Sequence, residues 1–148
     1  PKTIDMAFAI FEESDEGMLK REIILENVTI ALRNGFIVDT KNLSERLEKA
    51  INRTRSDIEL VPLMRMVGEL FPSMKIQKNN PSTLFETLVK KVKTSENLFQ
   101  KRLFLNTMLA GAKIFPEEAS INFASTGDHD IVTQFKIDTE LQKIQETL

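Results

Sequence analysis

Residues 80–112 have the sequence NPSTLFETLVKKVKTSENLFQKRLFLNTMLAGA, and this stretch indicates the fold class most directly. Asn80 is a favourable helix cap and Pro81 is favourable in a first helical turn, so a helix is expected to begin here. Its apolar residues recur every four positions, which is typical of a helix with one buried face: Leu84, Leu88 and Val92. We expect Ser95 to cap a second helix that continues to about Ala112.

Outward from this stretch, helical spacing of apolar residues occurs in four earlier segments. They cover about residues 3–13, 16–34, 43–53 and 61–72. The second segment is apolar over more than one stripe, which indicates a central helix, whereas the third has a narrow stripe typical of an exposed helix. Pro62 is best tolerated in a first helical turn, and Pro72 is expected to end the same helix. Residues 74–79 are then expected to form a loop.

The C-terminal third has a different pattern. Apolar and polar residues alternate through 121–123 and again through 131–137, which predicts a small β-hairpin near 120–137. A helix over the second run is the alternative, because short apolar runs fit both periods. A capping-box pattern at Thr139 predicts a C-terminal helix. The predicted fold class is mainly α: a single compact helical domain over residues 1–148 with about six to seven helices, complete or a fragment of a larger protein.

The composition excludes several classes of site. The chain has 148 residues with no Cys, no Trp, no Tyr and one His, so disulfides, thiol catalysis and sites that need two imidazoles are excluded. Neither glycine-rich phosphate motif is present. No apolar run approaches the roughly 20 residues of a membrane span. We expect an intracellular protein, cytoplasmic or nuclear, with no cofactor, no metal and no membrane partner.

Charge is distributed unevenly along the chain. Residues 73–115 hold 8 basic and 2 acidic side chains, whereas residues 116–148 hold 2 basic and 7 acidic ones. The basic segment is interpreted as a surface that binds an anion or a partner, or else as a solvated face whose cations complement helix dipoles. The candidate residues lie at the end of one predicted helix and along the next: Lys90, Lys91, Lys93, Lys101, Arg102, Asn106 and Lys113.

Two further patterns lie at the C-terminal end of the chain. Residues spaced as in a heptad seam predict either a dimer contact or an edge that docks on the domain's own core: Ile137, Leu141, Ile144 and Leu148. Asp128, His129 and Asp130 place two carboxylates beside the imidazole, which suits a metal or acid/base site as well as a polar turn. We favour the turn, because no second His or Cys can complete a zinc shell.

The functional hypothesis joins these observations. The shortage of catalytic residues, the heptad edge and the segregated charge favour a non-enzymatic protein-interaction, dimerisation or scaffold module within a larger assembly. Its partner is expected to be another protein or a second copy of the chain in a homo-oligomer. The alternative is a module that binds nucleic-acid phosphates through the basic face. It ranks second, because Tyr and Trp, which stack on bases, are missing.

Overall fold

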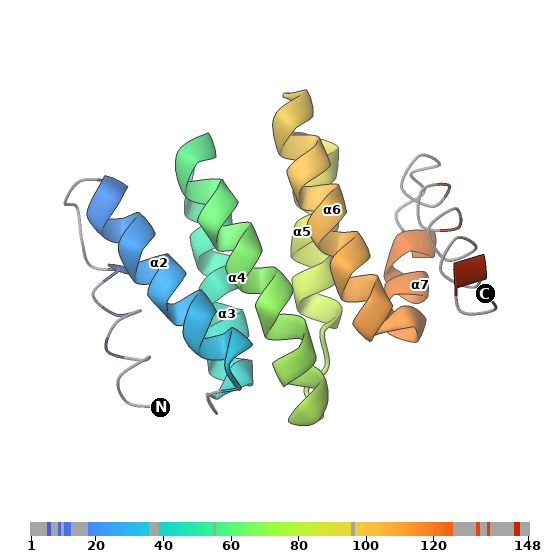
Figure 1. The fold of residues 1–148 in the computed structure, drawn as a ribbon. Helices are drawn as coiled ribbons and strands as arrows, with labels where there is room; N and C mark the ends of the chain where they lie inside the picture. The colour runs from blue at the N-terminus through green and yellow to red at the C-terminus, as the bar shows by residue number, and fades with distance from the viewer. Residues whose placement is uncertain are drawn as a thin grey trace.

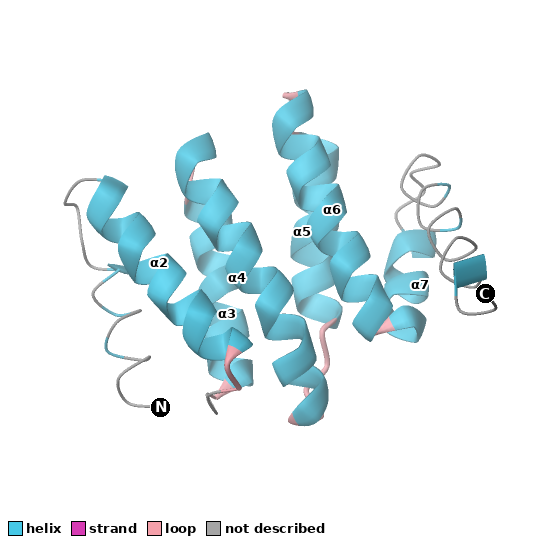
Figure 2. Cartoon of the chain, in the orientation of Figure 1, coloured by secondary structure: helices cyan, strands magenta, loops and turns pink. Residues whose placement is uncertain are grey.

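The computed structural model describes residues 6, 9, 11–12, 18–35, 39–54, 56–95, 97–125, 133, 136 and 144–145. These residues form six helices: α2 (Met18–Arg33), α3 (Thr40–Arg53), α4 (Asp57–Ile76), α5 (Ser82–Thr94), α6 (Leu98–Ile114) and α7 (Pro116–Ser125). Figure 2 shows helices and short loops, with no strand in the described part of the chain. The prediction of a mainly helical protein is confirmed.

The helices stack side by side in two layers (Figure 1). One layer contains α2, α4 and α6, and behind it α3 packs on α4 while α5 packs on α6. The hairpins α3–α4 and α5–α6 resemble each other, since each joins a helix of 14 or 13 residues to a longer one of 20 or 17. α7 packs against both α5 and α6. Such a stack presents the turns of successive hairpins along one edge, as helical-repeat proteins do.

Side-chain caps define where two of the helices begin. The Asp39 carboxylate accepts a hydrogen bond from Asn42 N at the start of α3, and the Asn97 side chain accepts one from Gln100 N at the start of α6. The prediction that Ser95 caps α6 is wrong. Ser95 is the C-cap of α5, where its hydroxyl donates to the Lys91 carbonyl, and Asn97 caps α6 instead.

Phenylalanine rings join the layers at the centre of the stack. Phe71 of α4 stacks on Phe85 of α5 with ring centroids 5.2 Å apart, and Phe115 meets Phe71 edge-on at 6.4 Å. Phe123 of α7 meets Phe85 edge-on at 6.0 Å. A Cβ atom at Gly111 would lie 2.5 Å from the Phe71 ring, so glycine is what allows α6 to approach α4 this closely.

Helix α4 differs from the prediction at both ends. It begins at Asp57 rather than near residue 61, and it continues through Pro72 to Ile76, so 74–76 belong to a helix and not to a loop. The reason is packing: Met74, beyond the second proline, is only 1% exposed. Burying such a side chain contributes about 2 kcal/mol, which helps to offset the hydrogen bond that proline removes.

Helix α2 is less central than its sequence indicates. Ile23 and Ile30 are 52% and 48% exposed, because α2 packs on α4 and leaves its opposite face open. The predicted exposed helix over 43–53 is confirmed by α3, which buries a narrow stripe that includes Leu43 and Leu47. The helix predicted over 3–13 lies mostly outside the described residues, and the four that are described are helical.

The β-hairpin predicted near 120–137 is wrong for the part that the structure describes. Ile121 and Phe123 lie in α7, where Phe123 is buried and Ile121 is 71% exposed. Ala119 and Phe123, four residues apart, share the buried face, which is the spacing of a helix and not of a strand. Thr133 and Lys136 are also helical, in agreement with the alternative for 131–137, and the rest of that run lies outside the described residues.

Candidate interaction surface

The α5–α6 hairpin brings most of the predicted basic residues to one edge of the stack. The last turns of α5 and the first turns of α6 meet across a short connection, and these turns carry Lys90, Lys91, Lys93, Lys101 and Arg102. Lys91 is half-buried and the other four are exposed. The hairpin therefore gathers cations that are separated in sequence.

The outer face of α6 carries a second part of the predicted set. Arg102, Asn106 and Lys113 are all exposed on it, as helical spacing predicts. Phe99, 51% exposed, lies one turn before them on the same face. At a rise of about 1.5 Å per residue, Lys113 is about 16 Å from Arg102 along the helix axis, so it belongs to the opposite edge of the stack.

These cations differ from those between α2 and α4. There, arginine side chains pair with carboxylates across the two helices: Arg21 with Glu59 at 2.9 Å, Arg33 with Glu69 at 3.0 Å and Arg65 with Glu26 at 3.1 Å. Helix α6 itself contains no Asp or Glu. Within the described part of the chain, no carboxylate pairs with five of the cations on α5 and α6: Lys90, Lys91, Lys101, Arg102 and Lys113. These five cations are thus without a carboxylate partner among the residues that the structure describes.

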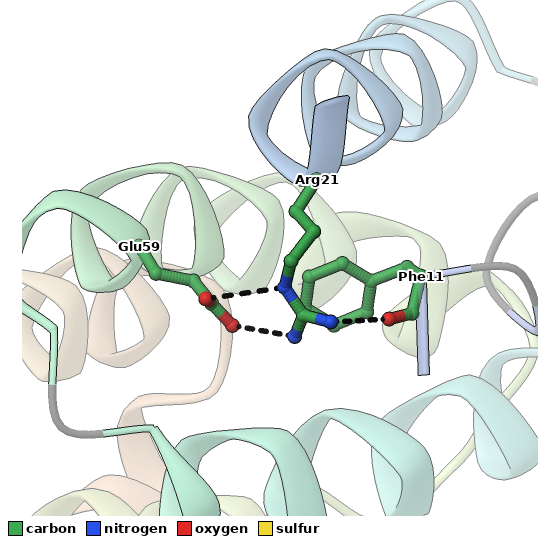
Figure 3. A network of polar contacts seen from close by, with 3 residues as sticks. All are labelled: Phe11, Arg21 and Glu59. Carbon is green, nitrogen blue, oxygen red and sulfur yellow. Dashed lines mark hydrogen bonds and ion pairs between the residues drawn. The ribbon is translucent and has the colours of Figure 1, made fainter. Parts of the chain in front are cut away.

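A polar network holds the N-terminal segment against the stack (Figure 3). Arg21 donates from Nε and Nη2 to the Glu59 carboxylate, and from Nη1 to the Phe11 carbonyl at 2.7 Å. Its guanidinium also lies 4.1 Å from the centre of the Phe11 ring. Because both charged side chains are mostly buried, at 20% and 14% exposure, they are occupied in joining Phe11, α2 and α4 and are not free to bind a ligand.

Two clefts open beside this network, at the edge where α3 and α5 end and α4 and α6 begin. The first has a volume of about 400 Å³ and is lined by Phe11, Glu12, Arg21, Lys49, Ala50, Arg53, Thr54, Ser56 and Glu59. The second has a volume of about 670 Å³ and is lined by Ile51, Thr54, Leu60, Lys91, Thr94, Ser95, Asn97, Gln100 and Phe104. Since both include Thr54, they adjoin, and we call them together the end groove.

Of the residues that line the end groove, only Lys91 belongs to the binding residues predicted from the sequence. Lys49 and Arg53 sit in the last two turns of α3, where cations are common because they complement the helix dipole. That local explanation gives no reason to join them to Lys91 of another hairpin. The signal for the groove is tertiary, because the α3–α4 and α5–α6 turns must first be placed side by side.

The two hairpins are tied together near the groove by Asp57. Its carboxylate accepts hydrogen bonds from the Asn97 side chain at 3.3 Å and from the Gln100 side chain at 2.5 Å. The negative charge at the start of α4 is therefore directed to two amides of the next hairpin. This contact fixes the start of α6 relative to α4.

The carboxyl group of Glu48, on α3, has a perturbed pKa. Burial raises the pKa of Glu48 above its ordinary value of 4.5, and the neighbouring carboxylates Glu45 and Glu86 add to the rise. A hydrogen bond from the Thr83 side chain lowers the pKa of Glu48, but by less than burial raises it. Among the described residues, the Glu48 Oε1 atom is buried without a hydrogen-bond partner. The contact between α3 and α5 therefore contains a carboxylate that folding disfavours in its charged form.

The other candidates are only partly within the described residues. Ile144 is helical and 55% exposed, while Ile137, Leu141 and Leu148 lie outside them, as does His129. Among the residues that are described, no three acidic or imidazole side chains come together in a way that could hold a metal ion. None of the described helices combines the length and apolar character needed to cross a bilayer.

Comparison with known proteins gives no further identification. No family model matches the chain, no curated protein matches it, and no solved structure matches its fold. We therefore infer a function from the residues and geometry of the α5–α6 hairpin and the end groove.

Proposed function

We propose that the chain is a non-enzymatic protein-interaction module that binds an acidic protein partner through the α5–α6 hairpin. The observation that carries the proposal is unpaired charge: the α2–α4 arginines pair with carboxylates, whereas no carboxylate of the described residues pairs with Lys90, Lys91, Lys101 or Arg102 at the hairpin turn. A partner with carboxylates would neutralise this surface. Such complementarity raises association rates and rejects basic partners.

The stacked architecture supports a binding role. The hairpins of a helical stack hold one edge of turns in fixed positions, so a ligand can contact several hairpins at once. The edge also exposes apolar side chains beside the cations, including Leu98 at 63% and Phe99 at 51%. Protein interfaces combine an apolar centre with a polar rim, and this edge offers both.

Charge reversal on the hairpin tests the proposal. A fluorescein-labelled polyglutamate peptide is titrated with the wild type and with a Lys101→Glu/Arg102→Glu variant at about 50 mM salt, where screening is weak. We expect the variant to bind about tenfold or more weakly, because it replaces two attractive charges by two repulsive ones. The matched control is Lys41→Glu at the start of α3, an exposed cation far from the hairpin turn.

A second candidate function is binding to nucleic-acid backbones. Five cations without a carboxylate partner among the described residues favour it: Lys90, Lys91, Lys101, Arg102 and Lys113. A single-stranded RNA that contacts four of them would lose about 50-fold in affinity between 50 and 200 mM salt. Titration of labelled RNA beside the peptide separates the two functions. If RNA binds more tightly than the peptide and shows this salt dependence, the second candidate replaces the first.

Self-association through the C-terminal seam is a separate part of the proposal. The heptad spacing that includes Leu141 and Ile144 fits a contact between two copies of the chain. Light scattering coupled to size-exclusion chromatography measures the mass of the particle directly. A monomer at all concentrations would remove the homo-oligomer from the proposal and leave the acidic partner unaffected.

A further inference from the structure

The end groove runs across the edge of the stack at which both hairpin turns lie. One end is bordered by α2 and α3 and the other by α5 and α6, with Thr54 between them. Packed helices generally lie about 10 Å apart, so a groove that crosses from α2 to α6 spans about 20 Å. An extended chain advances about 3.3 Å per residue and would need about six residues to cross it.

The charge that lines the groove is positive after internal pairing is taken into account. Its two carboxylates are engaged, Glu59 by Arg21 and Glu12 by Arg46. Three cations that line it have no carboxylate partner among the described residues: Lys49, Arg53 and Lys91. Because they are spread over both ends, they suit a ligand with several separate carboxylates better than one compact anion.

The second cleft offers a ligand little apolar surface, because its apolar lining residues are buried: Ile51, Leu60 and Phe104 are 0%, 3% and 2% exposed. Ile58, 56% exposed, lies next to Asp57, whose contacts to the start of α6 place Ile58 near the same edge.

We propose that the end groove binds an extended acidic segment of about six residues from a partner protein, with carboxylates at Lys49, Arg53 and Lys91. This inference rests on the proposed function and identifies the segment that the module recognises. Charge complementarity selects the acidic residues, and the length of the groove selects an extended segment.

The test is fluorescence anisotropy with the full chain and a labelled peptide of about eight residues that alternates glutamate and leucine, long enough to span the groove. The variants are Arg53→Glu and Lys91→Glu, with Arg53→Gln as a milder substitution and Lys41→Glu as the control. We expect each groove reversal to weaken binding by about fivefold, and Lys41→Glu to change it by less than about twofold. Circular dichroism establishes that each variant remains helical.

The results separate the inference from the proposed function. If the peptide binds and is weakened by Lys101→Glu/Arg102→Glu but not by Arg53→Glu or Lys91→Glu, the groove is not the site, although the module still binds acidic partners. If no peptide binds at about 50 mM salt, both the inference and the function are wrong. Equal binding of a peptide with glutamine in place of glutamate would overturn the role of charge, and tighter binding of single-stranded RNA would overturn the choice of ligand.

Discussion

Replacement of Gly111 by alanine tests how the stack is packed. The new Cβ atom would lie 2.5, 2.7 and 2.9 Å from three carbons of the Phe71 ring, whereas carbon atoms in contact lie about 3.5 to 4.0 Å apart. The ring would have to move by about 1 Å. It is fully buried, stacked on Phe85 and met by Phe115, so it cannot move without disturbing both.

The expected magnitude is a balance of two effects. Alanine stabilises a helix interior by about 1 kcal/mol relative to glycine, and overpacking a core costs about 1 to 3 kcal/mol. With Phe71 held on two sides we take the upper part of that range, which leaves Gly111→Ala destabilised by about 1 to 2 kcal/mol. For a chain of this size, that lowers the Tm by about 3 to 6 °C.

Gly68 provides a matched control in the adjacent helix. It also lies inside a helix, but a Cβ atom there would meet nothing within 4 Å. Gly68→Ala is therefore expected to raise stability by about 0.5 to 1 kcal/mol through helix propensity alone. Urea unfolding followed by circular dichroism gives both values. If Gly111→Ala is stabilised as much as Gly68→Ala, the close packing of α6 on α4 is refuted.

Three further predictions concern α7, Glu48 and the C-terminal seam. In urea unfolding, Phe123→Ala should lower the free energy of unfolding by about 3 kcal/mol or more and Ile121→Ala by less than about 0.5 kcal/mol, because only Phe123 is buried. Similar losses for the two variants would instead support a strand, in which alternate residues share a face. The raised pKa of Glu48 means that the folded protein holds this proton to higher pH than the unfolded chain does, so stability contributed by the protonated form is lost as the pH rises through the range above 4.5. Glu48→Gln should therefore raise the Tm at pH 7 and have no such effect near pH 4, whereas a gain that is independent of pH would contradict the assignment. Light scattering should show wild-type self-association that Leu141→Asp abolishes, and a variant that keeps the wild-type mass would exclude the seam.

Local patterns were sufficient to predict much of the helical framework. The residue spacing in α5 and α6 predicts both helices to within about two residues, because each combines an exposed polar stripe with apolar residues at helical spacing. The exposed polar stripe of Arg102, Asn106 and Lys113 follows from the same periodicity. These features depend on neighbours within one helix, which sequence spacing records.

The features that sequence reasoning missed depend on contacts between helices. The helix persists through Pro72 because Met74 is buried among other elements, and Ile121 and Phe123 have a spacing of two that a strand and a helix can both contain. The end groove requires Ile51 and Phe104, more than fifty positions apart, to line one cleft. No periodicity within a segment predicts such a pairing.

The central claim is that the end groove binds an acidic segment, and a nuclear magnetic resonance titration tests it most directly. The peptide that alternates glutamate and leucine is added to the uniformly ¹⁵N-labelled chain, and the amide shifts are followed residue by residue. We predict that the largest changes occur at Thr54, Lys91 and Asn97, which line the groove. Changes centred instead on the outer face of α2 and α4, near Ile30 and Arg65, or no changes at any amide, would contradict the account.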